Sequence, residues 1–403
     1  MSRNFLSGMA AVICCCACGN QEYEMGTYGY DLAFMEKQNV EIVELKSGDG
    51  QSKVMVVPAW QGRVMTTTSC GDGGDSYGWV NYKLIESGDV SPQFNPYGGE
   101  ERFWLGPEGG PFSWYFKKGQ DQVHANWVVP SVIDTDSYDI EQCDNRRVVF
   151  IKKFSIVNAS DISFDMKVRR TVRILDREEV SGLLGVEIPD NLDVVSYCSD
   201  NELTNDGDTP WNEKTGMPSV WMLGLFNPTP TTTVFIPYNQ ECKGQVVKDD
   251  YFGKIPSDRL AVKDGMIYFK IDGLCRTKLG LPPTSAKGYA ASYDVEKSVL
   301  TILKYNIPDG NHLYVNSQWG EQDNPFCGDV INSYNDGPTE DGTVMGPFYE
   351  IEASSPAAAL NCGESITHIQ YTTHIQGDKE LIGGLVRELF GVELTEITEM
   401  FAK

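Results

Sequence analysis

The sequence is poor in the residue patterns that carry common metal and nucleotide chemistry. Only four histidines occur among 403 residues, and none stands in an H-E-x-x-H motif. The glycine-rich segment Gly71–Ser76 lacks the lysine of a phosphate-binding loop and the spacing of a dinucleotide fingerprint, so it is interpreted as a turn. The sequence therefore gives no motif for a zinc protease, for a phosphate-binding loop or for a dinucleotide-binding domain.

Positive charge is also scarce. There are 33 Lys and Arg residues against 57 Asp and Glu residues, which gives a formal net charge of −24. This balance argues against nucleic acid and against an anionic membrane surface as partners. Hydrophobic residues make up 41% of the chain and charged residues 22%, which is typical of a globular protein.

The amino terminus has the pattern of a targeting segment. Arg3 is followed by the short apolar run Phe5–Ile13 and then by cysteines among small residues. This pattern resembles a bacterial lipoprotein signal, with Cys18 as the acylated cysteine and Cys16 as the second choice. We expect a signal over residues 1–18, a tether over 19–30 and a single domain over 31–403. The protein would then be exported and anchored by lipid in the cell envelope, at the outer membrane or in the periplasm, with no other membrane contact.

Cysteines after residue 18 are widely scattered and include no C-x-x-C pair, so they lack the sequence spacing of zinc ligands. An odd, dispersed set is more consistent with buried thiols than with a disulfide framework. The seven are Cys70, Cys143, Cys198, Cys242, Cys275, Cys327 and Cys362.

Alternating apolar and polar residues predict strands over most of the chain, without the strand–helix alternation of a parallel sheet. The fold class is therefore mainly β: a large antiparallel assembly with a few short helices, one of them near the carboxy terminus. Strands are expected at 40–45, 54–57, 146–157, 163–174, 234–237, 266–271, 298–305 and 365–374, helices at 75–86, 379–389 and 394–401, and long loops at 200–218 and 319–338.

The segment Tyr97–Phe112 reads YGGEERFWLGPEGGPF and is too rich in glycine and proline for a long helix. It nevertheless carries Arg102, Trp104 and the carboxylates Glu100, Glu101 and Glu108. A guanidinium beside carboxylates and an aromatic ring suits a polyhydroxylated ligand, because the polar groups hydrogen-bond hydroxyls and the ring packs on a sugar face. The alternative is a rigid surface corner with a structural ion pair.

Other polar groups carry weaker signals. Ser76 stands in a literal G-x-S-x-G match, yet the residues before it favour a turn serine over a nucleophile. His368 and His374 share a face of one expected strand, and we interpret them as independent residues rather than metal partners. An acidic loop contains Asp200, Glu202, Asn205, Asp206 and Asp208. Calcium would suit its oxygens, but the spacing misses the EF-hand pattern, so no cofactor is predicted and calcium is only left open.

Glu350 and Glu352 lie two residues apart on an expected strand and should point to one face. The strand leads into the small-residue loop that begins at Ser354, and a glutamate at such a strand end is a reasonable general base. The alternative is a solvent-exposed pair.

Three segments together resemble the galactose-mutarotase-like (aldose 1-epimerase-like) β-supersandwich superfamily, in particular a group of exported bacterial lipoproteins to which no function is assigned. They are VVPAWQGRVMTTTS (56–69), YGGEERFWLGPEGG (97–110) and FYEIEASSPAAALNCGESITHIQYTTH (348–374). The resemblance implies a sugar-binding supersandwich in which Arg102 holds the sugar and Glu352 is the base. It also implies a histidine acid, for which His124 and His374 are the candidates.

Two functions therefore stand beside each other. The first is a mutarotase-type isomerase with Trp104 or Trp319 stacked on the sugar ring. The second is a non-catalytic glycan-binding or scaffold lipoprotein. A third hypothesis, relation to polysaccharide lyases or hydrolases, would require a carboxylate pair across the site, either Glu108 with Glu352 or Glu321 with Glu352.

Overall fold

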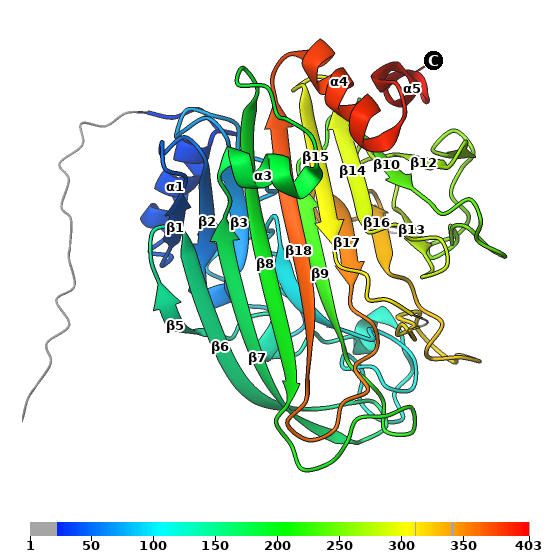
Figure 1. Cartoon of the computed structure of the whole chain (residues 1–403). Helices are drawn as coiled ribbons and strands as arrows, with labels where there is room; N and C mark the ends of the chain where they lie inside the picture. The colour runs from blue at the N-terminus through cyan, green and yellow to red at the C-terminus, as the bar shows by residue number, and fades with distance from the viewer. Residues whose placement is uncertain (1–21, 311, 340–341, 403) are drawn as a thin grey trace, which may run out of the picture.

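The computed structural model describes residues 22–310, 312–339 and 342–402, whose strands form three antiparallel sheets (Figure 1). The expected signal over residues 1–18 lies outside the described residues. Helix α1 (Tyr28–Lys37) begins within the expected tether, and Tyr28 is fully buried. It packs beside a small sheet formed by β1 (Val43–Lys46), β2 (Lys53–Val57) and β3 (Arg63–Thr68).

The largest sheet has ten strands in the order β11-β12-β10-β14-β15-β18-β8-β7-β6-β5. Their bounds are β5 (Asp139–Cys143), β6 (Arg147–Val157), β7 (Ser163–Ile174), β8 (Asp193–Asn205), β10 (Thr233–Pro237), β11 (Leu260–Lys263), β12 (Met266–Lys270), β14 (Tyr289–Asp294), β15 (Val299–Tyr305) and β18 (Ser365–Gln376). The third sheet has the order β13-β16-β17-β9-β4. Its strands are β13 (Thr277–Leu281), β16 (Ile331–Asn335), β17 (Tyr349–Ser354), β9 (Ser219–Phe226) and β4 (Arg102–Gly106).

The two larger sheets pack face to face, because each strand turns alternate side chains toward the partner sheet. Ile351 and Ala353 of β17 share a core with Val234 of β10 and Leu303 of β15. The intervening Glu350 and Glu352 therefore face away from the ten-stranded sheet. The outer face of the five-stranded sheet thus carries these two glutamates among buried apolar residues such as Trp221, Leu223 and Leu225.

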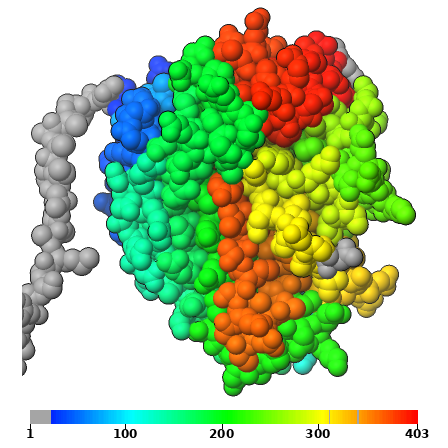
Figure 2. Space-filling view, viewed as in Figure 1, coloured from blue at the N-terminus to red at the C-terminus, as the bar shows by residue number. Residues whose placement is uncertain are grey.

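Helices cover one end of the opposite face of the ten-stranded sheet. Leu385 and Val386 of α4 (Lys379–Phe390) are buried with Leu300 and Ile375 of the sheet, and α5 (Leu394–Glu399) follows. Helix α3 (Arg177–Leu184) contributes Val180 to the same cluster. Figure 2 shows the carboxy-terminal residues, in orange and red, over this end of the sheet. The apolar stripe predicted near the carboxy terminus is thus a cover for the sheet.

The mainly β class and the carboxy-terminal helices are confirmed, while three local expectations were wrong. The helix expected over 75–86 is only α2 (Tyr82–Ser87), because Gly78 and Val80 instead form bridges with Phe226 and Gly98. The loop expected at 200–218 is strand β8 as far as Asn205, since it pairs with both β7 and β18. The loop expected at 319–338 contains β16.

Short 3-10 turns complete the described elements: η1 (Pro58–Trp60), η2 (His124–Asn126) and η3 (Ser131–Ile133). All seven cysteines after residue 18 are free thiols. Four of them are exposed and three are partly exposed, so the expectation of buried thiols was also wrong. Among the described residues, no helix has the length and apolar character needed to cross a membrane.

Candidate functional site

Strand register assembles a polar site on the outer face of the five-stranded sheet. Glu352 of β17 stands opposite Leu223 of β9, which in turn stands opposite Arg102 of β4. Glu350 stands opposite Tyr334, and Tyr334 opposite Lys278 of β13. Residues that are directly opposite in a sheet share a face, so these side chains converge although up to 250 residues separate them in sequence.

Arg102 lies over an aromatic surface. The centre of its guanidinium is 3.9 Å from the Trp104 ring centroid and 5.2 Å from that of Phe94. One guanidinium nitrogen lies 3.8 Å from a carboxylate oxygen of Glu350. Burial lowers the pKa of Arg102, and the Glu350 charge partly offsets this. The close contact with Trp104 restricts the guanidinium, which suits directional hydrogen bonds to a ligand.

Glu352 is fully buried, and besides its two hydrogen-bond donors it interacts with the neighbouring Glu350 carboxyl group. Its Oε2 accepts hydrogen bonds from Lys278 Nζ at 2.9 Å and from Trp221 Nε1 at 3.0 Å. Its Oε1 has no hydrogen-bond partner among the described residues. Arg102 Nε and Trp104 Nε1 are likewise buried and without a partner. Buried atoms without a partner in the described part of the chain also occur between the sheets, for example at His368 and at Gln370 Oε1, so here they show only that Glu352, Arg102 and Trp104 each have an atom free for a further hydrogen bond.

Three carboxyl groups surround Lys278. Burial alone would lower the pKa of Lys278, but Glu352, Glu350 and Glu108 together raise it. Burial and the Glu352 carboxylate raise the pKa of Glu350. The lysine therefore stays charged, and repulsion within this group of acids favours retention of a proton on one of them.

Glu108 comes to the site from the connection between β4 and β5. Burial raises its pKa to about 7, Lys278 opposes this rise, and Glu352 adds to it. The indoles of Trp319 and Trp127 lie beside the carboxyl group. Trp319 is 37% exposed and stacks on Trp127 with ring centroids 6.2 Å apart. The site thus contains a carboxylic acid that exchanges its proton near neutral pH beside an accessible aromatic ring.

Three predicted residues lie elsewhere. Glu101 points between the sheets and pairs with Arg170 at 2.7 Å, so it does not meet Arg102. His124 is exposed on η2 and stacks on Trp127 at the outer edge of the site, 6.1 Å between ring centroids. His374 lies on the other side of the five-stranded sheet from Glu352.

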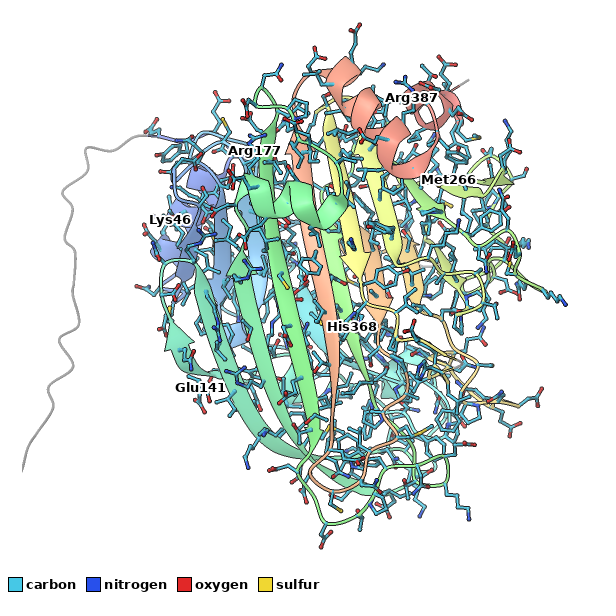
Figure 3. The ribbon with its side chains drawn as sticks, viewed as in Figure 1. Lys46, Glu141, Arg177, Met266, His368 and Arg387 are labelled. Atoms are coloured by element: carbon cyan, nitrogen blue, oxygen red, sulfur yellow. The ribbon has the colours of Figure 1, made fainter. Side chains whose placement is uncertain are left out.

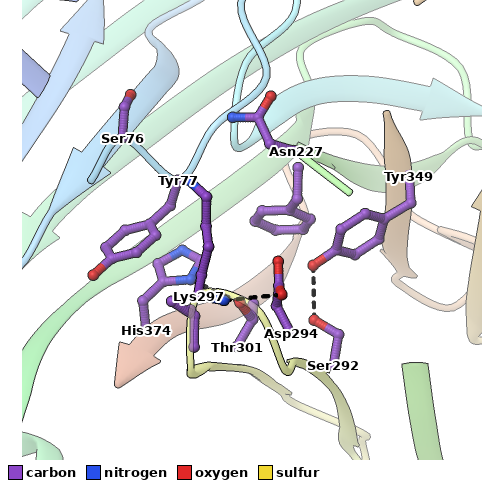
Figure 4. Close-up of a pocket in the computed structure, with 11 residues that line it drawn as sticks. Ser76, Tyr77, Asn227, Ser292, Asp294, Lys297, Thr301, Tyr349 and His374 are labelled. Carbon is purple, nitrogen blue, oxygen red and sulfur yellow. Dashed lines mark hydrogen bonds between the residues drawn. The ribbon is translucent and has the colours of Figure 1, made fainter. Parts of the chain in front are cut away.

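His374 lines a separate small pocket between the sheets (Figure 4). The pocket has about 350 Å³ of empty space, including its open mouth. Both nitrogens of His374 are engaged: Nε2 lies 2.8 Å from Glu100 Oε1, and Nδ1 lies 2.8 Å from Thr301 Oγ1. Its ring also stacks on Tyr77. Ser76 lines the same pocket and is hydrogen-bonded to Asp31 and Thr66, which fits a structural serine. The polar side chains of this pocket are hydrogen-bonded to one another or to neighbouring residues, and the pocket is separate from the Glu352 site.

His368, the other histidine of β18 (Figure 3), is fully buried, and burial lowers its pKa to about 4. It is therefore neutral at physiological pH. Of the acidic residues considered for calcium, Asp200, Glu202 and Asn205 belong to β8, and the described residues contain no group of three His, Cys, Asp or Glu side chains suited to a metal ion.

Sequence reasoning missed Lys278, Trp221 and Trp127. Lys278 lies in the strand TKLGL and Trp221 in SVWMLGLF, and neither stretch differs from an ordinary strand. A lysine inside a strand otherwise buried on both faces was the available signal, since lysine is seldom buried without a partner. Trp127 lies three residues after His124, and only His124 was considered as a functional residue in this segment.

The family model described as "Family of unknown function (DUF6786)" matches residues 26–401. The chain belongs to this family. No curated protein matches the chain in sequence.

Several solved structures are similar at low identity. A galactose mutarotase-like protein from Lactobacillus casei is 10% identical, with a TM-score of 0.49, and the match covers 83% of this chain and 100% of that one. The Slr1438 protein from Synechocystis is 14% identical, with a TM-score of 0.48 and coverage of 84% and 96%. A galactose mutarotase related enzyme from Lactobacillus acidophilus is 9% identical, with a TM-score of 0.45 and coverage of 84% and 98%.

Proposed function

We propose that this DUF6786 protein binds a sugar on the outer face of its five-stranded sheet and interconverts the two anomers of that sugar. The observation that carries the proposal is the state of Glu352. One of its carboxylate oxygens is fixed by Lys278 and Trp221, and the other is buried without a partner. A fixed carboxylate with one open oxygen is suited to take a proton from a bound hydroxyl.

In the proposed reaction, Glu352 accepts the proton of the anomeric hydroxyl. The bond between the anomeric carbon and the ring oxygen then breaks, and the ring oxygen takes a proton from Glu108. The open aldehyde turns about its carbon–carbon bond and closes again, which returns both protons. Glu108 is suited to the acid role because its pKa of about 7 leaves a protonated fraction at neutral pH. No histidine is needed, although the sequence resemblance implied one.

The remaining side chains would bind and orient the sugar. Arg102 would offer guanidinium donors beside Trp104, and Trp319 would offer an accessible ring face. Glu108, Trp319 and Trp127 come from the connections that follow β4 and β15 rather than from strands. The proposal requires these segments to move, because Glu352 is fully buried, while the strand ladder stays intact.

The second candidate is a non-catalytic sugar-binding protein. The Lys278 ammonium only 2.9 Å from Glu352 favours it, because a nearby positive charge stabilises the carboxylate and weakens it as a base. The two candidates agree on the binding site and differ only in turnover.

Anomer exchange separates them. Proton NMR would measure the rate at which α- and β-glucose and α- and β-galactose interconvert with the full chain present, and calorimetry would measure binding. Under the isomerase proposal, Glu352→Gln removes the acceleration and keeps the binding. Glu388→Gln, at an exposed glutamate of α4, is the matched control and should change neither. Binding without acceleration in the wild type would favour the second candidate.

We further propose export and lipid attachment at Cys18, on the strength of the amino-terminal sequence pattern alone. Growth of the bacterial host with a labelled fatty acid should label the wild-type chain and Cys16→Ala but not Cys18→Ala. Equal labelling of all three would contradict attachment at Cys18.

A further inference from the structure

A second aromatic surface lies beside the proposed sugar site, at the β13 edge of the same sheet face. Phe252 is 45% exposed, which is unusual for a phenylalanine, yet its ring is held in place. The guanidinium of Arg276 lies over the ring at 3.9 Å, and the ring meets Tyr334 edge-on with centroids 5.9 Å apart. Arg276 Nε also donates to the Tyr334 hydroxyl at 3.3 Å.

This surface is continuous with the residues around Glu352. Tyr334 stands directly opposite both Glu350 and Lys278 in the sheet. Tyr251, next to Phe252 in sequence, has its ring 5.9 Å from Lys278 Nζ and is hydrogen-bonded to Asp329. The same face therefore carries aromatic rings on both sides of Glu352, with Trp319 on one side and Phe252 on the other.

The spacing of the strands sets the size of ligand that would reach both surfaces. Neighbouring strands lie about 4.8 Å apart, so β13 is roughly 10 Å from β17, the strand that carries Glu352. A pyranose ring is about as wide as one strand spacing. A sugar unit at Glu352 and Trp319 would thus leave room for about one or two further units toward Phe252.

The chemistry of this second surface also suits a sugar unit. A ring with an open face packs on sugar C–H groups, and an adjacent guanidinium donates hydrogen bonds to hydroxyls. A purely structural Phe252 would instead bury its ring against Tyr334. The exposed ring held by Arg276 has the form of a binding platform.

We propose that the ligand is a short linear oligosaccharide of two or three units, with its reducing-end unit at Glu352 and the next unit on the Phe252–Arg276 surface. The inference rests on the proposed function, since it requires that the Glu352 site bind a sugar. In this proposal, Phe252 and Arg276 bind the second sugar unit and take no part in proton transfer.

The test is calorimetry on the full chain with matched ladders of one to three units: glucose, cellobiose and cellotriose, and galactose with its β-1,4-linked di- and trisaccharides. The expected result is at least tenfold tighter binding of a disaccharide than of its monosaccharide. Phe252→Ala should remove that gain and leave monosaccharide affinity unchanged. Phe252→Tyr keeps a ring and should keep the gain, and Val157→Ala, an exposed apolar residue on β6, is the surface control.

Two outcomes would overturn the inference, and they differ. If monosaccharides bind as tightly as their oligomers, and Phe252→Ala changes nothing, the second surface is not a subsite while the proposed function stands. If no sugar in either ladder binds to the wild type, the proposed function fails and the inference fails with it.

Discussion

Glu101 and Arg102 are neighbours in the chain, yet they enter two ionic clusters that differ in how completely their charges are partnered. Between the sheets, Glu101 accepts hydrogen bonds from Arg170, Ser199 and Gln370 at 2.7–3.0 Å. Arg170 also donates to Gly62 O and Asn201 Oδ1. On the outer face, Arg102 has only a 3.8 Å contact with Glu350, and its Nε has no partner among the described residues.

The difference separates a close, multiply hydrogen-bonded ion pair from a loose one. Hydrogen bonds of good geometry offset the desolvation cost of a buried pair, so the Glu101–Arg170 pair should be costly to break. A buried cluster with open hydrogen-bonding atoms is less stable than it could be, and that deficit is characteristic of sites that complete their bonding with a ligand. Both clusters are buried and charged, so burial alone would not distinguish them.

The largest expected effect is on turnover. Glu352→Gln should lower the rate of anomer exchange by about 10²–10⁴-fold, because the amide cannot accept the hydroxyl proton. Its effect on the free energy of unfolding should stay within about 1 kcal/mol, since the neutral amide relieves repulsion with Glu350 while losing the Lys278 pair. Exchange kinetics and urea unfolding measure the two quantities. A variant that keeps full activity would remove Glu352 from the mechanism.

The inter-sheet pair should show the reverse pattern. Arg170→Met should lower the free energy of unfolding by about 3–5 kcal/mol, because Glu101 is left as a buried and unpaired charge. Sugar affinity per folded molecule should not change, and urea unfolding with calorimetry would show both. The double variant Arg170→Met with Glu101→Gln should recover part of the loss. A loss below 1 kcal/mol in the single variant would contradict the structural assignment.

Much of this architecture is predictable from the sequence, and the reasons show where prediction stops. The alternation of Phe164, Met166, Val168, Val172 and Ile174 specifies β7 and its buried face. The same alternation places Arg170 in the core, but the pattern alone does not name its partner, because Glu101 arrives from another sheet.

The site was predictable only in part, for a related reason. Glu350 and Glu352 share a face by the period of a strand, and Arg102 with Trp104 follows the same rule within β4. The divergence of Glu101 from Arg102 follows from that rule too, once the segment is known to be a strand rather than a loop. Lys278 stands out as a lysine in a buried strand, but its pairing with Glu352 depends on strand order, which local sequence does not encode.

Acid–base behaviour gives a third prediction of intermediate size. The pKa of Glu108 is about 7 in the folded state, above its ordinary value of 4.5. Because the folded state holds this proton more tightly, stability should fall by about 1–3 kcal/mol as pH rises from about 4.5 through 7. Anomer exchange should decline over the same upper range as the acid loses its proton. Urea unfolding at several pH values would measure the stability change.

Glu108→Gln is the control for this pH dependence. It should flatten this part of the stability profile and lower the exchange rate at every pH. An unchanged profile would show that Glu108 titrates in its ordinary range.

The smallest effect contrasts two buried serines. Ser199 donates to Glu101 at 3.0 Å, so Ser199→Ala should cost about 1 kcal/mol of stability. Ser219, at the β9 end beside β4, is equally buried but its hydroxyl has no partner in the described part of the chain. Ser219→Ala should therefore be neutral or slightly stabilising. Urea unfolding of both variants would check the contrast, and equal losses would contradict it.

Sugar binding by the outer face can be tested with two substitutions at adjacent residues. Calorimetric titration of the full chain with the mono- and oligosaccharide ladders would compare the wild type with Arg102→Ala and Glu101→Gln. We expect Arg102→Ala to lower affinity at least tenfold, while Glu101→Gln lowers stability and leaves affinity per folded molecule unchanged. Equal loss of affinity in both variants, or no effect of Arg102→Ala on a sugar that binds the wild type, would contradict this expectation.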